Sequence, residues 1–102
     1  MYKVTVLYNY PKNPDEFEKY YHDVHLPIAR QMPHLSKLEL TKFEVGPGDT
    51  QPAYHRMAEI FYSSKEVMEE SMGTPESQAA IDDLQNFATG GVTIMLGAVS
   101  EG

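Results

Sequence analysis

Apolar and polar residues alternate in several parts of the chain, which is the pattern of strands with two different faces. Near the N-terminus, Val4, Val6 and Tyr8 share one face of such a segment. Stretches rich in Pro, Gly and Asn separate the alternating segments from the rest of the chain. The pattern predicts four strands, at Lys3–Tyr8, Leu35–Val45, His55–Tyr62 and Val92–Val99.

Helical periodicity fills the two remaining stretches. Asn13 has the position of an N-cap, and the helix after it carries one apolar stripe. The stripe consists of Phe17, Tyr21, Val24 and Ile28. A second helical stretch is expected in two pieces, one capped by Ser63 and ending near Met72, the other capped by Thr74 and running from about Pro75 to Phe87. The inner side of the second piece carries Ala80, Ile81, Leu84 and Phe87.

The resulting order of elements, β-α-β-β-α-β, predicts the ferredoxin-like α+β fold, in which a four-stranded antiparallel sheet carries both helices on one face. Residues 1–102 then form a single domain. Three strands carry apolar side chains on both faces, as with Leu7 beside Val6 and Met57 beside Ala58. Because such a face is expected to be covered, we expect a homodimer joined through the sheet faces.

Composition narrows the function classes. The chain has 102 residues, a net charge of −7 and no cysteine. The acidic balance argues against nucleic acid and against an anionic membrane surface, and the lack of cysteine excludes thiolate chemistry and cysteine-based metal sites. There is no signal-peptide pattern and no apolar run of ~18 residues, so a cytoplasmic location is the expectation.

The chemistry-bearing side chains concentrate around His25. This residue lies at the edge of the apolar stripe and is of a type that titrates near neutral pH. Pro27 is expected to break the helix, since proline removes a backbone donor and clashes with the preceding turn. In the functional interpretation His25 is a general acid or base at a cleft beside that break. In the structural interpretation it hydrogen-bonds a carbonyl that Pro27 leaves without a donor.

Other side chains are weaker candidates. His55 either supplies a second imidazole across the cleft or is a surface residue at the start of its strand. Glu59 is either a buried carboxylate that needs a partner or a solvated one. Tyr20 and Tyr21 either present hydroxyls to a pocket or pack in the core. His22 should point towards water, so His22 and His25 are not expected to bind a metal. The residues expected to bind substrate are Tyr8, Tyr21, Ile28 and Glu59.

The first helix also carries a motif. From Phe17 to Ala29 the residues follow the pattern F-x-x-Y-Y-x-x-x-H-x-P-x-A, after an opening strand Val4–Tyr8. In these residues the chain resembles the EthD family of dimeric α/β-barrel proteins. It departs at Pro33-His34, where the family usually has Pro-Gly. The resemblance implies a dimer, and a His or Tyr that acts without a cofactor in a cleft between sheet and helices.

These observations favour a small cofactor-independent enzyme of catabolic or secondary metabolism, acting on an apolar organic molecule. His25 would transfer the proton, with His55 or a tyrosine such as Tyr20 as the second proton carrier or as the donor to an oxyanion. The reaction would be an isomerisation, a lyase-type step, or an oxidation in which the substrate itself activates oxygen. The alternatives are a non-catalytic dimer that binds a ligand or assists another enzyme of a degradation pathway, and a purely structural interaction domain.

Overall fold

The computed structural model of the chain describes residues 1–101. The strands are β1 (Tyr2–Asn9), β2 (Lys37–Lys42), β3 (Tyr54–Tyr62) and β4 (Val92–Ala98). The α-helices are α1 (Pro14–Tyr20), α2 (Leu26–Ala29), α3 (Lys65–Met72) and α4 (Pro75–Asp83). A π-helical turn η1 (Tyr21–His25) joins α1 to α2, and two 3-10 turns lie at η2 (Pro47–Asp49) and η3 (Leu84–Asn86).

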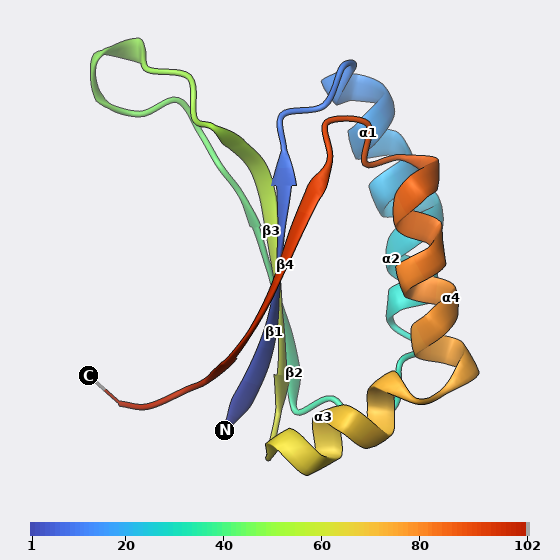
Figure 1. Ribbon diagram of the computed structural model, residues 1–102. Helices are drawn as coiled ribbons and strands as arrows, with labels where there is room; N and C mark the ends of the chain where they lie inside the picture. The colour runs from blue at the N-terminus through green and yellow to red at the C-terminus, as the bar shows by residue number, and fades with distance from the viewer. Residues whose placement is uncertain (102) are drawn as a thin grey trace.

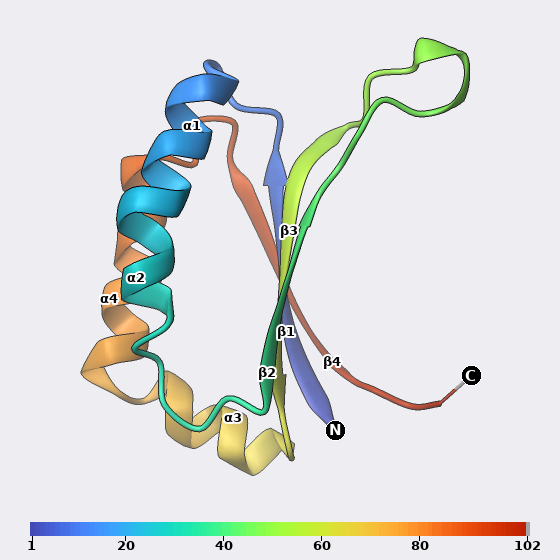
Figure 2. The ribbon, with the colours of Figure 1, turned by 180° about the vertical axis from the view of Figure 1, so that it is seen from behind.

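The four strands form one antiparallel sheet in the order β2-β3-β1-β4. Helices α1 to α4 lie on one side of this sheet, as Figures 1 and 2 show from opposite directions. The predicted ferredoxin-like α+β fold is therefore confirmed. None of the helices in residues 1–101 is long and apolar enough to cross a membrane.

Aromatic rings fill the space between α1 and the end of β1. Tyr8 is almost fully buried, and its ring centroid lies 5.3 Å from that of Phe17 and 5.6 Å from those of Tyr21 and Phe87. The contacts with Phe17 and Tyr21 are edge-to-face, the arrangement that the ring quadrupole favours. Truncating one of these rings to alanine should cost about 3–5 kcal/mol.

The N-caps of α1 and α4 are the predicted residues, whereas the N-cap of α3 is not. Asn13 Oδ1 accepts a hydrogen bond from the Glu16 amide at 3.2 Å, and Thr74 caps α4. The cap of α3 is Ser64, whose hydroxyl accepts from the Val67 amide, so the prediction of Ser63 was wrong by one residue. Met68 of this helix is buried in the core.

The irregularity expected at Pro27 is present, since the regular α-helix ends at Tyr20 and a second short helix, α2, starts at Leu26 with Pro27 in its first turn. The chain stays helical from Pro14 to Ala29, and the irregularity is a π-helical turn in which the Leu26 amide donates to the Tyr21 carbonyl. A wider turn relieves the clash between a proline ring and the carbonyl four residues before it.

The wider turn also moves the buried stripe. Val24, predicted to be buried, is 38% exposed, whereas His25, predicted at the edge of the stripe, is 5% exposed. Leu26 and Ala29 take the inward positions that follow, and Ile28 is only half-buried. The prediction failed here because it assumed a constant α-helical period.

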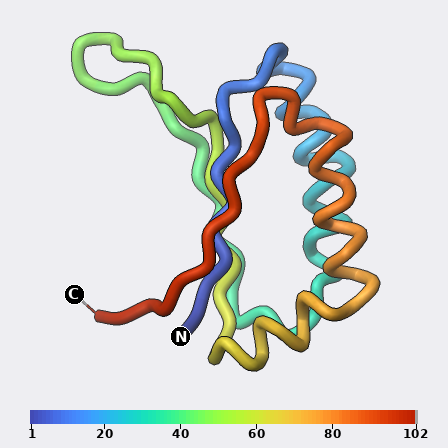
Figure 3. Tube along the Cα trace, viewed as in Figure 1, coloured from blue at the N-terminus to red at the C-terminus, as the bar shows by residue number. Residues whose placement is uncertain are grey.

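The face of the sheet opposite the helices is less covered. Leu7 and Met57 are half-buried there, Met95 is 46% exposed, and Lys3 and Glu59 form an ion pair at 2.7 Å. The connection between β2 and β3, and the chain after β4, both extend to this side of the sheet, as the trace in Figure 3 shows. The outer face of the sheet therefore lies between two projecting segments.

Candidate functional site

A cavity of about 470 Å³ lies between the sheet and the helices. This size is within the range of small-molecule sites. Its walls include Val4 and Ile60 from the sheet, Leu26 from α2 and Met68 from α3. Only four wall residues carry a polar side-chain group: Tyr8, Tyr21, His25 and Glu69. The rest are hydrocarbon or methionine side chains and Gly73. The cavity therefore offers a large apolar surface with a few polar groups.

His25 is held on the cavity wall by a buried carboxylate. Its Nδ1 lies 2.9 Å from Oδ2 of Asp83, and both side chains are buried. Its Nε2 makes no hydrogen bond within residues 1–101. The partner of His25 is thus a carboxylate and not a backbone carbonyl, which differs from the structural interpretation of the sequence.

Electrostatics fix the state of this pair. Burial lowers the pKa of His25, and the Asp83 carboxylate offsets this only in part. Burial would raise the pKa of Asp83, but hydrogen bonds from Tyr20, Asn86 and His25 outweigh it and hold that pKa below its usual value. Asp83 is therefore ionised and His25 neutral near pH 7. Because a carboxylate only accepts, we assign the ring proton to Nδ1, which leaves a lone pair on Nε2.

Tyr20 supports Asp83 and does not line the cavity. Its hydroxyl donates to Asp83 Oδ1 at 2.6 Å, and the Asn86 amide donates to the same oxygen at 2.9 Å. The hydrogen bond to Asp83 raises the pKa of Tyr20. The hydroxyl of Tyr20, which the sequence offered as a second proton carrier, is thus bonded to Asp83 and lies off the cavity wall.

Tyr21 and Tyr8 line the cavity beside His25. Burial raises the pKa of Tyr21 to about 12 and raises that of Tyr8 well above its usual value, so both phenols keep their protons. The Tyr21 hydroxyl is the one buried polar side-chain atom in residues 1–101 without a hydrogen-bond partner. Such atoms are rare in folded proteins, and this one is a donor for a polar group that reaches it.

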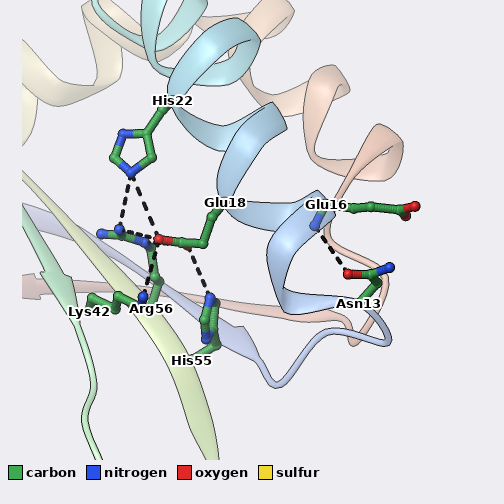
Figure 4. Close-up of polar contacts among 7 residues, drawn as sticks. All are labelled: Asn13, Glu16, Glu18, His22, Lys42, His55 and Arg56. Atoms are coloured by element: carbon green, nitrogen blue, oxygen red, sulfur yellow. Dashed lines mark hydrogen bonds and ion pairs between the residues drawn. The ribbon is translucent and has the colours of Figure 1, made fainter.

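His55 does not lie on the cavity wall, although the sequence predicted it in the cleft. The pairing of β1 with β3 shifts after Tyr8, which pairs with Arg56, whereas Asn9 pairs with Tyr54. At this bulge both His55 and Arg56 reach Glu18 on α1, as Figure 4 shows. A bulge re-aims a side chain, and simple alternation could not reveal it.

Glu18 is the centre of a second polar cluster, which ties α1 to β3. Arg56 donates to its two oxygens at 2.8 and 2.7 Å, and His55 Nε2 lies 3.0 Å away. The hydrogen bonds from Arg56 lower the pKa of Glu18 to about 2. His22 and Lys42 lie at the exposed edge of the cluster, 3.8 and 3.7 Å from Glu18 Oε1.

Two more predicted residues fall outside the cavity. Glu59 lies on the outer face of the sheet, paired with Lys3. Ile28 lines a separate surface groove between α2 and α4, with Pro27 and Ala79 among its neighbours. No group of three or more His, Cys, Asp or Glu side chains in residues 1–101 is arranged to hold a metal ion.

Sequence reasoning missed Asp83 and the cavity methionines. Asp83 lies three residues after Ala80 and four before Phe87, on the inner stripe predicted for the second helical stretch. An acid at such a position is a signal for a buried partner, because a lone buried charge is costly. Met68 and Met72, which were not among the expected site residues, form one wall of the cavity.

Comparisons with known proteins place this chain in a family. The EthD domain model matches residues 9–91. An 11.0 kDa protein from the thcB-thcC intergenic region of Rhodococcus erythropolis is 35% identical over 95 residues, covering 93% of this chain and 91% of that protein.

Solved structures agree with this match. The crystal structure of an ethyl tert-butyl ether d (EthD) family protein from Bacillus halodurans superposes with a TM-score of 0.90 at 29% identity, covering 98% of this chain and 99% of that one. A dimeric protein with a ferredoxin-like fold from Bacteroides fragilis shares the fold at a TM-score of 0.67 and 14% identity, covering 96% and 95% of the two chains. The chain belongs to the EthD domain family.

Proposed function

We propose that the protein is a small enzyme of catabolic or secondary metabolism that moves a proton on an apolar organic molecule, using His25 and no metal or nucleotide cofactor. One observation carries the proposal: His25 lies on the wall of an apolar cavity with Nδ1 bonded to a buried Asp83 and Nε2 without a partner. A neutral imidazole oriented by a carboxylate is a suitable general base near neutral pH.

The reaction begins at a carbon next to a carbonyl group. His25 Nε2 takes the proton, and the electron pair of the C–H bond moves onto the carbonyl oxygen as an enolate. Asp83 stabilises the imidazolium that forms, and the phenols of Tyr21 and Tyr8 supply hydrogen bonds for the enolate oxygen. Return of the proton to a different carbon completes an isomerisation, and loss of a leaving group with its electron pair completes a lyase-type step.

Exchange of carbon-bound protons tests this proposal without knowledge of the natural substrate. The protein is incubated with 2-decanone in D₂O, and deuterium uptake next to the carbonyl is followed by NMR. We expect His25→Asn to lose on the order of 10²–10⁴ in rate. The matched control is His55→Asn, which removes a histidine outside the cavity. Equal exchange rates in the parent and His25→Asn would refute the assignment.

The rival proposal is a non-catalytic module that binds an apolar ligand. The wall of the cavity, which is apolar over most of its area, supports it as well as it supports an enzyme. Measuring both binding and proton exchange, in the parent and in His25→Asn, distinguishes the binding module from the enzyme. A binding module would hold 2-decanone without any exchange above that of the buffer, and it would do so equally in the parent and in His25→Asn.

We also propose that two copies associate through the outer faces of their sheets. Support comes from Met95, which is exposed there, and from Leu7 and Met57, which are half-buried on the same face. Stable interfaces commonly bury about 1,200 Å² or more in total. Analytical ultracentrifugation should give twice the chain mass, and Met95→Lys should shift the equilibrium towards monomer. A parent protein of 11.5 kDa in dilute solution would contradict the dimer.

A further inference from the structure

The cavity has two chemically different ends. Tyr8, Tyr21 and His25 are neighbours at one of them, with ring centroids 5.6 Å apart for the two tyrosines and 5.9 Å for Tyr21 and His25. Methionines form the other: Met68 and Met72 come from α3, and Met32 follows α2. The first end offers hydrogen-bonding groups, and the second offers flexible apolar side chains.

The pairing of the strands shows that these two ends of the cavity lie at opposite ends of β1. Tyr8 lies near one end of β1, whereas α3 begins three residues after Tyr62, which pairs with Tyr2 at the other end. The two ends of β1 are about 20 Å apart at ~3.3 Å per residue. Figure 1 shows α3 at the N-terminal end of β1 and the start of α1 near the opposite end. An elongated molecule can therefore touch both sets of side chains at once.

The charges around the cavity are negative. No Lys or Arg of residues 1–101 lies on its wall, while Glu69 does, and the Asp83 carboxylate lies directly behind His25. Arg56, whose guanidinium carbon lies 4.8 Å from the centre of the Tyr21 ring, is engaged by Glu18. A carboxylate or phosphate on a ligand would thus be buried without a cation and close to an acid, which is costly.

The opening of the cavity is apolar as well. Ile94 and Leu96 on β4 belong to its wall and are 47% and 56% exposed. Ile81 on α4 is a third wall residue that is also exposed. Exposed members of a cavity wall mark its mouth, so a ligand enters between β4 and α4 past hydrocarbon side chains.

We infer that the ligand of this cavity is an uncharged, elongated molecule with one polar group at the His25 end and an apolar chain that extends to the methionines. The inference rests on the proposed function, because it names the substrate class of the same site. Thioether side chains adapt to different shapes, so the methionine end accepts chains of varied outline up to a length limit. The polar end requires a group that accepts a hydrogen bond from a phenol.

Calorimetric titration of the whole chain at pH 8 tests this directly, with 2-alkanones from 2-hexanone to 2-decanone and with the carboxylates of equal length. Affinity for the ketones should rise about fourfold per added methylene and then level off at the chain length that reaches the methionines. Each carboxylate should bind at least about tenfold more weakly than the ketone of the same length.

Variants at the methionine end set the length limit. Met68→Trp should move the plateau to shorter ketones, and Met72→Phe should do the same at a less buried position. Met68→Leu is the matched control, because it keeps the apolar volume, and its plateau should not move. Far-UV circular dichroism identifies which variants are folded.

Three results would overturn the inference: decanoate binding as tightly as 2-decanone, a plateau unchanged in the folded variants, or no binding of any ketone. These results are separate from the failure of the proposed function. If the ketones bind with the expected length limit in both the parent and His25→Asn, yet no proton exchange occurs, the substrate class stands and the catalytic proposal fails.

Discussion

Two polar clusters hold the first helical segment, and they differ in what they leave unbonded. In one, Asp83 orients His25, whose second nitrogen has no partner and whose ring lies on a cavity wall. In the other, Glu18 binds Arg56 with both oxygens and also binds His55, away from that wall. Both clusters contain a carboxylate and a histidine. Their difference shows that an unbonded atom facing a cavity, and not the number of titratable groups, identifies the candidate site.

The largest effect expected from this comparison is at Asp83. Asp83→Asn presents an amide that can donate to Nδ1 of His25, which would move the ring proton to Nε2 and remove the base. We expect proton exchange into 2-decanone to fall by about 10²-fold or more. Glu18→Gln is the matched control in the other cluster and should retain most of the parent rate. An equal loss in both variants would mean that the clusters do not differ in role.

For the free energy of unfolding, the Glu18 cluster should matter more than it does for proton exchange. Glu18→Gln removes the charge that pairs with the buried Arg56, and we expect a loss of about 2 kcal/mol in the free energy of unfolding. Urea titration of the parent and Glu18→Gln at pH 6 measures this loss. If Glu18→Gln is as stable as the parent, the charge of Glu18 makes no net contribution to the free energy of unfolding.

The same cluster predicts a pH window. The folded-state pKa of Glu18 is lowered from 4.5 to about 2, so its contribution is fully present above pH 4.5 and is lost as the pH falls towards 2. Repeating the urea titrations across that window should show a gap between parent and Glu18→Gln that closes as the pH falls. A gap that stays constant with pH would contradict the role of this carboxylate.

The smallest effect concerns the π-helical turn, Tyr21–His25, that brings His25 to the cavity wall. Because this turn leaves Val24 exposed, Val24→Asp should change the free energy of unfolding by less than about 0.5 kcal/mol. An unbroken α-helical stripe would instead place Val24 in the core, where an unpaired acid costs several times more. Urea titration distinguishes the two arrangements.

Most of the fold could be predicted from the sequence, because strand alternation and helix caps are local signals. The four strands and the caps at Asn13 and Thr74 appear where the patterns indicate. The π-helical turn could not be predicted in this way. It moves His25 inward to meet Asp83, which is 58 residues away along the chain, and no local period encodes that contact.

The candidate site was predicted only in part. His25, Tyr21 and Tyr8 line the cavity, whereas His55, Tyr20, Glu59 and Ile28 do not. His55 was misplaced by a bulge, and Ile28 was displaced by the π-helical turn. Tyr20 binds Asp83, a residue whose importance depends on tertiary packing. The misplacements of His55, Tyr20 and Ile28 arose where one extra residue, or a distant partner, changed the position of a side chain. Glu59 lies in regular register on the outer face of the sheet.

The state of the His25 ring is the most direct test of the account. Nitrogen-15 NMR of the imidazoles at pH 8 reports which ring nitrogen carries the proton, and addition of 2-decanone reports which nitrogen faces the cavity. The account predicts a neutral ring with its proton on Nδ1, and a ligand-induced shift at Nε2 of His25 but not at His55. A proton on Nε2 of His25, or a ligand response at His55 alone, would contradict it.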